Sequence, residues 1–296
     1  MSLTFDLLVA GLRLGRRRHI YANEAAVRRG IAAVRRAGPD LPGARLRREL
    51  HVAESLFEGR PVYHLRPPGP SASAKRLIYL HGGAYVRPMT RHHWRLVREL
   101  ALRTPCEVVV PFYPLAPESR CTDTLAWALR LFAQWATPGH TVVLGGDSAG
   151  AGLAMALSQD LLAAGQRGPD RLLLITPAVD WNLATPAVAA IAPSDPMLMP
   201  EGAVAATRLY AGELPLSDWR LSPAQGPLAG LAPTLLLTAG RDILAPGGQA
   251  LARQMQAAGV DVHLWHAPTM IHVWPVLPAP EGRAARETIA RWLQAS

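Results

Sequence analysis

The stretch TVVLGGDSAGAG, residues 141–152, constrains the fold more than any other part of the chain. Its first four residues are apolar or β-branched and predict a buried strand, and the small apolar run 149–161 predicts a helix packed on that strand. Glycines 146 and 150 flank Ser148 and allow a sharp turn between strand and helix. We therefore expect the Ser148 hydroxyl at the carboxyl edge of a sheet.

The rest of the chain indicates an α/β protein. Short apolar runs alternate with stretches of helical spacing, which predicts a mostly parallel sheet with helices on both faces. The 296 residues are 49% hydrophobic and 18% charged, enough to bury a large core. We expect one α/β domain spanning residues 1–296, since no internal repeat or low-complexity tract divides the chain.

Cysteine usage and hydropathy exclude several classes of protein. Cys106 and Cys121 are not in a CxxC spacing, so we expect no zinc site and no dithiol redox chemistry. At the amino terminus the arginines follow the apolar stretch instead of preceding it, which is the wrong order for a secretory signal. No run approaches the roughly 18 apolar residues of a membrane span. The sequence thus predicts a cytoplasmic protein without integral membrane association.

Positive charge is concentrated near the amino terminus. Residues 1–50 hold eleven arginines and four acidic residues, while the whole chain has a formal charge of +9. Such a segment is compatible with an anionic membrane surface or a nucleic acid. Because no aromatic residues interleave the arginines, we favour a solvated helical face and expect no nucleic-acid partner.

Ser148 is placed to be a nucleophile, because the helix after it directs its dipole and free N–H groups at any negative charge formed there. A serine hydroxyl also needs a base, an acid and an oxyanion hole. The segment KRLIYLHGGAY, residues 75–85, predicts a strand followed by a glycine loop. We expect the N–H groups of Gly82, Gly83 and Ala149 to hold the oxyanion.

The motifs along the chain resemble the hormone-sensitive-lipase-like branch of the α/β-hydrolases. In chain order they are HGGA at 81–84, YPLAPE at 113–118, GDSAG at 146–150, an acid at Asp242 and a late histidine at His272. The resemblance covers most of residues 75–275. It implies an α/β-hydrolase fold with an eight-stranded sheet and carboxylic-ester hydrolysis without metal or organic cofactor.

The acid is predicted to be Asp242, which follows the strand-like run PTLLLTAGR at the carboxyl edge of the sheet. On its own an aspartate there is more typical of a surface ion pair with Arg241 or of a helix cap, and it is the order of the motifs that favours a catalytic acid. Asp261 is the rival, but it stands at the start of the next apparent strand, where a catalytic acid is not expected.

The base is predicted to be His272, which follows that last strand by a short loop. His263 and His266 alternate with apolar residues inside the strand and are expected to be side chains of the strand itself. The order serine, acid, histidine along the chain is the α/β-hydrolase order of nucleophile, acid and base.

The sequence departs from the family pattern near the site. Ala84 replaces a third glycine, Pro114 replaces a frequent arginine, and APGG at 245–248 replaces acidic residues that often follow the acid. By resemblance, Tyr113 and Glu118 support the oxyanion loop, and residues 1–50 and 180–222 form a cap over the site. The expected substrate-binding residues are Tyr85, Met197, Leu198 and Tyr210. They suggest a hydrophobic acyl group, although core packing explains several of them equally well.

The sequence predicts a serine carboxylesterase that cleaves small esters of short to medium acyl chains through an acyl-enzyme. Two alternatives remain open at this point: hydrolysis of lactones or amides by the same three residues, and a non-catalytic ligand-binding member of the fold. A homodimer is compatible with this fold.

Overall fold

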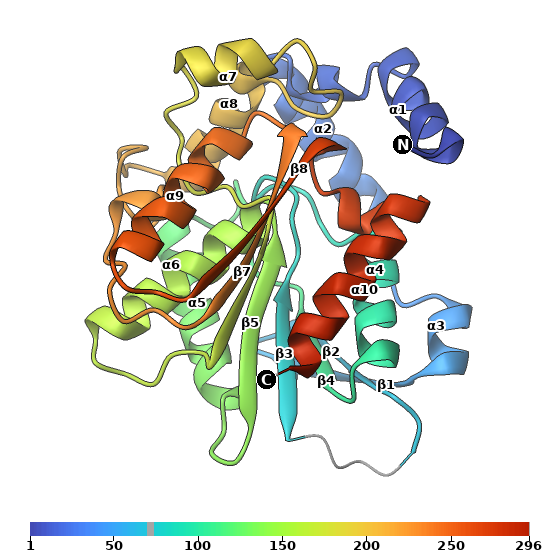
Figure 1. Ribbon diagram of the computed structural model, residues 1–296, viewed down its shortest axis with the longest axis vertical. Helices are drawn as coiled ribbons and strands as arrows, with labels where there is room; N and C mark the ends of the chain where they lie inside the picture. The colour runs from blue at the N-terminus through green and yellow to red at the C-terminus, as the bar shows by residue number, and fades with distance from the viewer. Residues whose placement is uncertain (70–73, 296) are drawn as a thin grey trace.

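A single mixed sheet organises the computed structural model, which describes residues 1–69 and 74–295 (Figure 1). Its strands are β1 (His51–Phe57), β2 (Arg60–Arg66), β3 (Lys75–Leu80), β4 (Glu107–Pro111), β5 (Thr141–Asp147), β6 (Arg171–Ile175), β7 (Thr234–Arg241) and β8 (Val262–Ile271). They lie in the order β1-β2-β4-β3-β5-β6-β7-β8. β2 alone runs in the direction opposite to the other strands, so the predicted eight-stranded, mostly parallel sheet is confirmed for the described residues.

Helices cover both faces of the sheet (Figure 1). On one face lie α5 (Cys121–Trp135), α6 (Ala149–Ala163) and α9 (Ala245–Ala257), and on the other α4 (Arg91–Arg103) and α10 (Pro280–Gln294). Side chains of successive strand residues point to opposite faces. In β5, Val142 and Leu144 therefore join the core beneath α6, whereas Val143 joins the core beneath α4 and α10.

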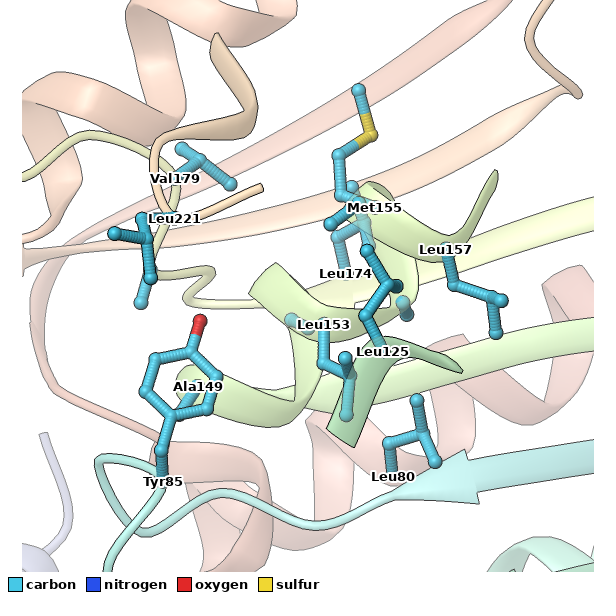
Figure 2. Packing of buried hydrophobic residues seen from close by; sticks show 14 of the residues in the cluster. Leu80, Tyr85, Leu125, Ala149, Leu153, Met155, Leu157, Leu174, Val179 and Leu221 are labelled. Atoms are coloured by element: carbon cyan, nitrogen blue, oxygen red, sulfur yellow. The ribbon is translucent and has the colours of Figure 1, made fainter. Parts of the chain in front are cut away.

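The core beneath α6 fixes the position of that helix (Figure 2). Leu153 and Leu157 of α6 pack in one cluster with Leu80 of β3, Leu125 of α5 and Leu174 of β6, and all are at most 4% exposed. Each such side chain contributes about 1.5–3 kcal/mol of burial free energy. The start of α6, where Ser148 lies, is thereby held rigidly against the ends of the strands.

Two segments distant in sequence lie together beyond the carboxyl ends of the strands (Figure 1). The first contains α1 (Leu3–Leu14), the 3₁₀ helix η1 (Arg17–Tyr21) and α2 (Glu24–Ala37); the second contains α7 (Pro186–Ile191) and α8 (Pro200–Ala211). Both α2 and η1 pack on α8. A Cβ added at Gly202 would lie 2.1 Å from the Tyr21 carbonyl oxygen, so only glycine permits this approach.

The remaining elements are small. Helix α3 (Ala44–Glu49) falls within the sequence range expected for a cap, but it packs beside β1, away from the strand ends. Two further 3₁₀ turns are η2 (Pro223–Gln225) and η3 (Trp274–Val276). In the part of the chain that the structure describes, no helix has the length and apolar character needed to cross a bilayer.

Candidate active site

Ser148 occupies a strained turn between β5 and α6. Its φ of 53° and ψ of −121° lie outside the regions that non-glycine residues favour. The turn fits only because its neighbours lack side chains: a Cβ at Gly146 would lie 2.3 Å, and one at Gly150 2.0 Å, from the Leu80 carbonyl oxygen. The glycine spacing around Ser148 thus reflects close packing against the end of β3, as expected.

Three side chains from three loops form a continuous chain of hydrogen bonds. Ser148 Oγ lies 2.9 Å from His272 Nε2, and His272 Nδ1 lies 2.8 Å from Asp242 Oδ2. Asp242 directly follows β7, and His272 directly follows β8. All three side chains are buried, with Ser148 8% exposed. The structure therefore brings together the three residues that the sequence order singles out.

The environment of His272 favours a charged imidazole. Burial lowers its pKa, but the charge of Asp242 and the hydrogen bond to it outweigh burial, and the net effect raises the pKa above the ordinary value. Asp242 is oriented by the Leu244 N–H, which donates to its Oδ1 at 2.9 Å. The acidic residues that often follow the acid are missing at 245–248, and this contact with the Leu244 N–H holds Asp242 in their absence.

Asp195 is a buried carboxylate that sequence reasoning missed. Its Oδ1 accepts the N–H groups of Met197 at 2.7 Å and Leu198 at 2.9 Å, and its Oδ2 accepts that of Ile243 at 3.0 Å. Burial and the nearby charge of Asp242 raise its pKa to about 6. Asp195 ties the segment before α8 to the loop that carries Asp242. The only sequence signal was an Asp-Pro pair, which is typical of any turn.

The expected oxyanion donors need one correction. The Gly82 N–H donates to Asp147 Oδ1 at 2.9 Å, so it is already occupied and points into the turn. A Cβ at Gly82 would lie 2.2 Å from Asp147 Oδ2, which shows how closely the two residues pack. The N–H groups of Gly83 and Ala84 have no partner among the described residues and border the same cavity as Ser148 and Ala149. Ala84 thus replaces Gly82 as a candidate donor.

Buried polar contacts hold this loop in place. Asp147 accepts a hydrogen bond from the Tyr79 hydroxyl and lies 3.3 Å from His93 Nε2. The Tyr113 hydroxyl donates to the His81 carbonyl at 2.6 Å, and the two rings stack at 4.5 Å. These contacts agree with the structural role that the resemblance implies for Tyr113.

Glu118 reaches the loop through an arginine. Its Oε2 forms an ion pair with Arg35 of α2 at 2.9 Å, and Arg35 Nη1 donates to the Val86 carbonyl at 3.0 Å. Because Val86 follows the oxyanion loop, Glu118 supports that loop indirectly.

A cavity of about 420 Å³ opens onto Ser148 and His272. Met197 and Leu198 line it, as expected, and so do His92 and His93 of α4. Tyr85 and Tyr210 do not line this cavity. Their rings stack on each other at 3.9 Å with both side chains about 1% exposed, because a stacked aromatic pair buries more apolar surface than two rings at a pocket rim. The substrate-binding expectation for this tyrosine pair is therefore corrected.

The residues considered as alternatives to Asp242 and His272 lie away from Ser148. The Asp261 carbonyl accepts the Thr234 N–H at the amino end of β7, the edge opposite Ser148. His266 lies within β8 and bonds to the Thr238 hydroxyl at 2.9 Å. In the described ranges 1–69 and 74–295, no group of three or more His, Cys, Asp or Glu residues is arranged to hold a metal. Cys106 and Cys121 are buried free thiols.

The chain belongs to the α/β-hydrolase family: a family model described as an alpha/beta hydrolase fold matches residues 77–276. An esterase from Acinetobacter venetianus is 30% identical over 258 residues, covering 80% of this chain and 84% of the relative. An acetyl-hydrolase from Streptomyces hygroscopicus is 33% identical, covering 74% of this chain and 75% of the relative. The crystal structure of an esterase from the bacterial hormone-sensitive lipase family superimposes with a TM-score of 0.80 at 27% identity, covering 100% of this chain and 98% of that one. The resemblance to the hormone-sensitive-lipase-like branch is confirmed.

Proposed function

We propose that this chain is a serine hydrolase of carboxylic esters, with Ser148 as nucleophile, His272 as general base and Asp242 as orienting acid. The observation that carries the proposal is the hydrogen-bonded chain of these three residues, at 2.9 and 2.8 Å, beside a cavity at a strained strand-to-helix turn. Relatives named esterase and acetyl-hydrolase support the choice of ester as the bond that is cleaved.

In the proposed reaction, His272 Nε2 removes the proton of Ser148 as the serine oxygen attacks the ester carbonyl carbon. Asp242 stabilises the imidazolium, and the raised pKa of His272 is consistent with that role. The N–H groups of Gly83, Ala84 and Ala149 stabilise the oxyanion. The imidazolium then gives its proton to the leaving alcohol, and water attacks the acyl-enzyme with His272 again as base.

The helical segments beyond the strand ends act as a cap in this proposal. Residues 1–37 and 180–222 would cover the site, while α3 would belong to the main domain. Met197 and Leu198 make the cavity wall apolar, and a volume of about 420 Å³ suits short to medium acyl chains. A cytoplasmic location and a homodimer stay predictions.

The test is hydrolysis of p-nitrophenyl esters from acetate to laurate by the purified protein and by Ser148→Ala. We expect hydrolysis that peaks at short to medium chains and is lost in the variant, with circular dichroism confirming that both proteins are folded. Hydrolysis that survives in Ser148→Ala would refute the nucleophile. No hydrolysis by the folded parent would contradict the proposed activity on simple esters. Matched lactones and amides, run in parallel, identify the preferred bond.

A further inference from the structure

Two arginines line the cavity of Ser148 without an acidic partner. Arg17 opens the 3₁₀ helix η1, and Arg87 follows the oxyanion loop by three residues. Both side chains are half-buried. In residues 1–69 and 74–295, neither guanidinium forms an ion pair.

The backbone around each arginine is fixed. The Arg87 N–H donates to the Gly83 carbonyl at 2.9 Å, so the turn that presents the oxyanion donors also sets the position of Arg87. A Cβ at residue 30 would lie 2.7 Å from Arg87 Nη2, and glycine there leaves room for the guanidinium against α2. Arg17 is followed by Arg18, whose Nη1 donates to the carbonyls of Ala192 at 3.3 Å and Asp195 at 3.2 Å.

The two guanidinium groups repel each other. Burial lowers the pKa of Arg17; nearby Tyr21 raises it in part, and the charge of Arg87 lowers it. Arginine keeps its proton in proteins, so two like charges converge on a partly desolvated wall. An anion between them would relieve this repulsion, and the guanidinium fork matches the geometry of a carboxylate.

Among the described residues, the two carboxylates that line the cavity, Asp40 and Asp147, form no ion pair with Arg17 or Arg87. Asp147 is used by Tyr79, Gly82 and His93. Asp40 is exposed and its Oδ2 accepts the Arg91 N–H at 2.8 Å. Burial, together with nearby Arg95, lowers the pKa of His92 to about 4, so His92 is neutral near pH 7.

From this arrangement we propose that the site takes carboxylic esters that also carry a free carboxylate, and that Arg17 and Arg87 bind this carboxylate. The inference rests on the proposed function and narrows its substrate class. The free carboxylate lies either on the acyl part, as in a monoester of a dicarboxylic acid, or on the alcohol part, as in an ester of a hydroxy acid. The chemistry of recognition is the same in both cases.

The experiment compares kcat/KM for charged and neutral esters of equal size. Monoethyl glutarate against its ethyl glutaramate analogue tests a carboxylate on the acyl part; 3-butyryloxypropanoate against its amide tests one on the alcohol part. We expect the parent to favour the anionic ester by at least about tenfold in one pair. In Arg17→Gln and Arg87→Gln, we expect the ratio of charged to neutral kcat/KM to fall about tenfold, because each variant loses one charge-assisted contact.

Two controls separate local binding from net charge and folding. Arg29→Gln removes one positive charge from an exposed position of α2 outside the cavity, so it should keep the parent ratio. Arg87→Lys keeps the charge and should restore part of the preference. If neutral esters are hydrolysed but the ratio is unchanged in both glutamine variants, or falls equally in Arg29→Gln, the anion-binding inference is wrong.

A second measurement tests the arginines independently of turnover. Glutarate binding to Ser148→Ala, followed by calorimetry, should weaken about tenfold when Arg17→Gln is added. If no ester is hydrolysed but this weakening is seen, the proposed function fails while the anion site stands. If esters are hydrolysed but glutarate binds equally with and without Arg17, the anion site fails while the proposed function stands.

Discussion

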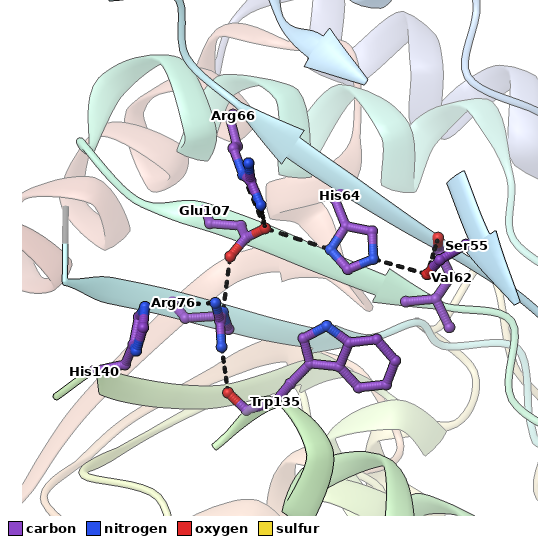
Figure 3. A network of polar contacts seen from close by, with 8 residues as sticks. All are labelled: Ser55, Val62, His64, Arg66, Arg76, Glu107, Trp135 and His140. Atoms are coloured by element: carbon purple, nitrogen blue, oxygen red, sulfur yellow. Dashed lines mark hydrogen bonds and ion pairs between the residues drawn. The ribbon is translucent and has the colours of Figure 1, made fainter. Parts of the chain in front are cut away.

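Two arrays of serine, histidine and carboxylate can be compared in the described residues, and only one of them lies beside the cavity. In the first, Ser148, His272 and Asp242 meet at the carboxyl edge of the sheet. In the second, Ser55 Oγ lies 2.9 Å from His64 Nε2, and His64 Nδ1 lies 3.4 Å from Glu107 Oε1 (Figure 3). The serine–histidine distances are the same, so distance alone does not make a nucleophile.

The surroundings of the second array differ in each respect that matters for catalysis. Ser55 lies inside an ordinary strand at the sheet edge, without a positive φ and without a helix starting after it. Its hydroxyl donates to the Val62 carbonyl at 3.5 Å. Neither Ser55 nor His64 lines the cavity that Ser148 shares with His272.

The two carboxylates also serve different purposes. Glu107 is bound by Arg66 and by Arg76, both at 2.8 Å, so its charge is already balanced (Figure 3). Asp242 has no arginine partner among the described residues, and its charge acts on His272. A carboxylate neutralised by guanidinium groups stabilises the fold, whereas one paired only with histidine can stabilise an imidazolium during turnover.

Replacing the histidine of each array in turn should give the largest difference in kcat between the two arrays. His272→Ala removes the proposed base, and we expect kcat for p-nitrophenyl butyrate to fall on the order of 10⁵-fold. His64→Ala should leave kcat within about twofold and lower the free energy of unfolding by about 1–3 kcal/mol, because Glu107 loses a partner. A large loss of kcat in a folded His64→Ala protein would contradict a purely structural role for the array of Ser55, His64 and Glu107.

Acid should weaken the second array in a defined pH window. Burial alone would raise the pKa of Glu107, but hydrogen bonds from His64, Arg66 and Arg76 outweigh burial and lower the pKa from 4.5 to about 2. This stabilisation is complete above the unfolded-state pKa and is lost as pH falls from 4.5 towards 2. The difference in pKa corresponds to about 3 kcal/mol of unfolding free energy.

Urea unfolding between pH 6 and 2 measures this effect. Glu107→Gln should flatten the pH dependence in that window, whereas Glu213→Gln, at an exposed position without an ion pair in the described residues, should not. Equal slopes in Glu107→Gln and the parent would refute the linkage.

Asp147 offers a smaller effect, on the loop that carries the proposed oxyanion donors. Asp147→Ala leaves the Gly82 N–H without its acceptor, so the loop loses its anchor, and we expect kcat to fall about hundredfold with little change in KM. Asp147→Asn keeps an acceptor oxygen and should recover most of kcat. If the asparagine variant is as slow as the alanine variant, the charge of Asp147 matters more than its contact with Gly82.

The smallest effect is expected for Ser55→Ala. The variant removes one hydroxyl that bonds to His64, so the free energy of unfolding should fall by about 1 kcal/mol and kcat should not change. A titration with a fluorophosphonate probe should label the variant to the same extent as the parent. Reduced labelling would indicate that Ser55 reacts as well.

Features set by local sequence were predictable. The turn at Ser148 requires glycines at fixed spacing, and the strand and helix beside it have clear apolar patterns. The meeting of Asp242 and His272 with Ser148 was predictable from their order after strands, because the carboxyl ends of parallel strands meet at one edge of a sheet. These inferences need only chain order and element type.

Features set by contacts between distant segments were not predictable. Whether the Gly82 N–H faces the cavity depends on where the Asp147 carboxylate lies, 65 positions along the chain. Asp195 becomes buried only because its loop closes over Ile243. Tyr85 follows the loop at 81–84 directly, and it stacks on Tyr210 only because α8 packs against this part of the chain. The amphipathic spacing of residues within one helix or strand contains no information on contacts between distant segments.

The close approach of Gly202 to the Tyr21 backbone couples the amino-terminal segment to the central segment that contains α8. A segment transplanted from a relative with any larger residue at position 202 would collide with η1, whatever the quality of its pocket residues. Recombination within this family should therefore yield working chimeras only when the amino-terminal and central segments are inherited from the same parent. The two segments would then be exchanged together during evolution and in directed recombination libraries alike.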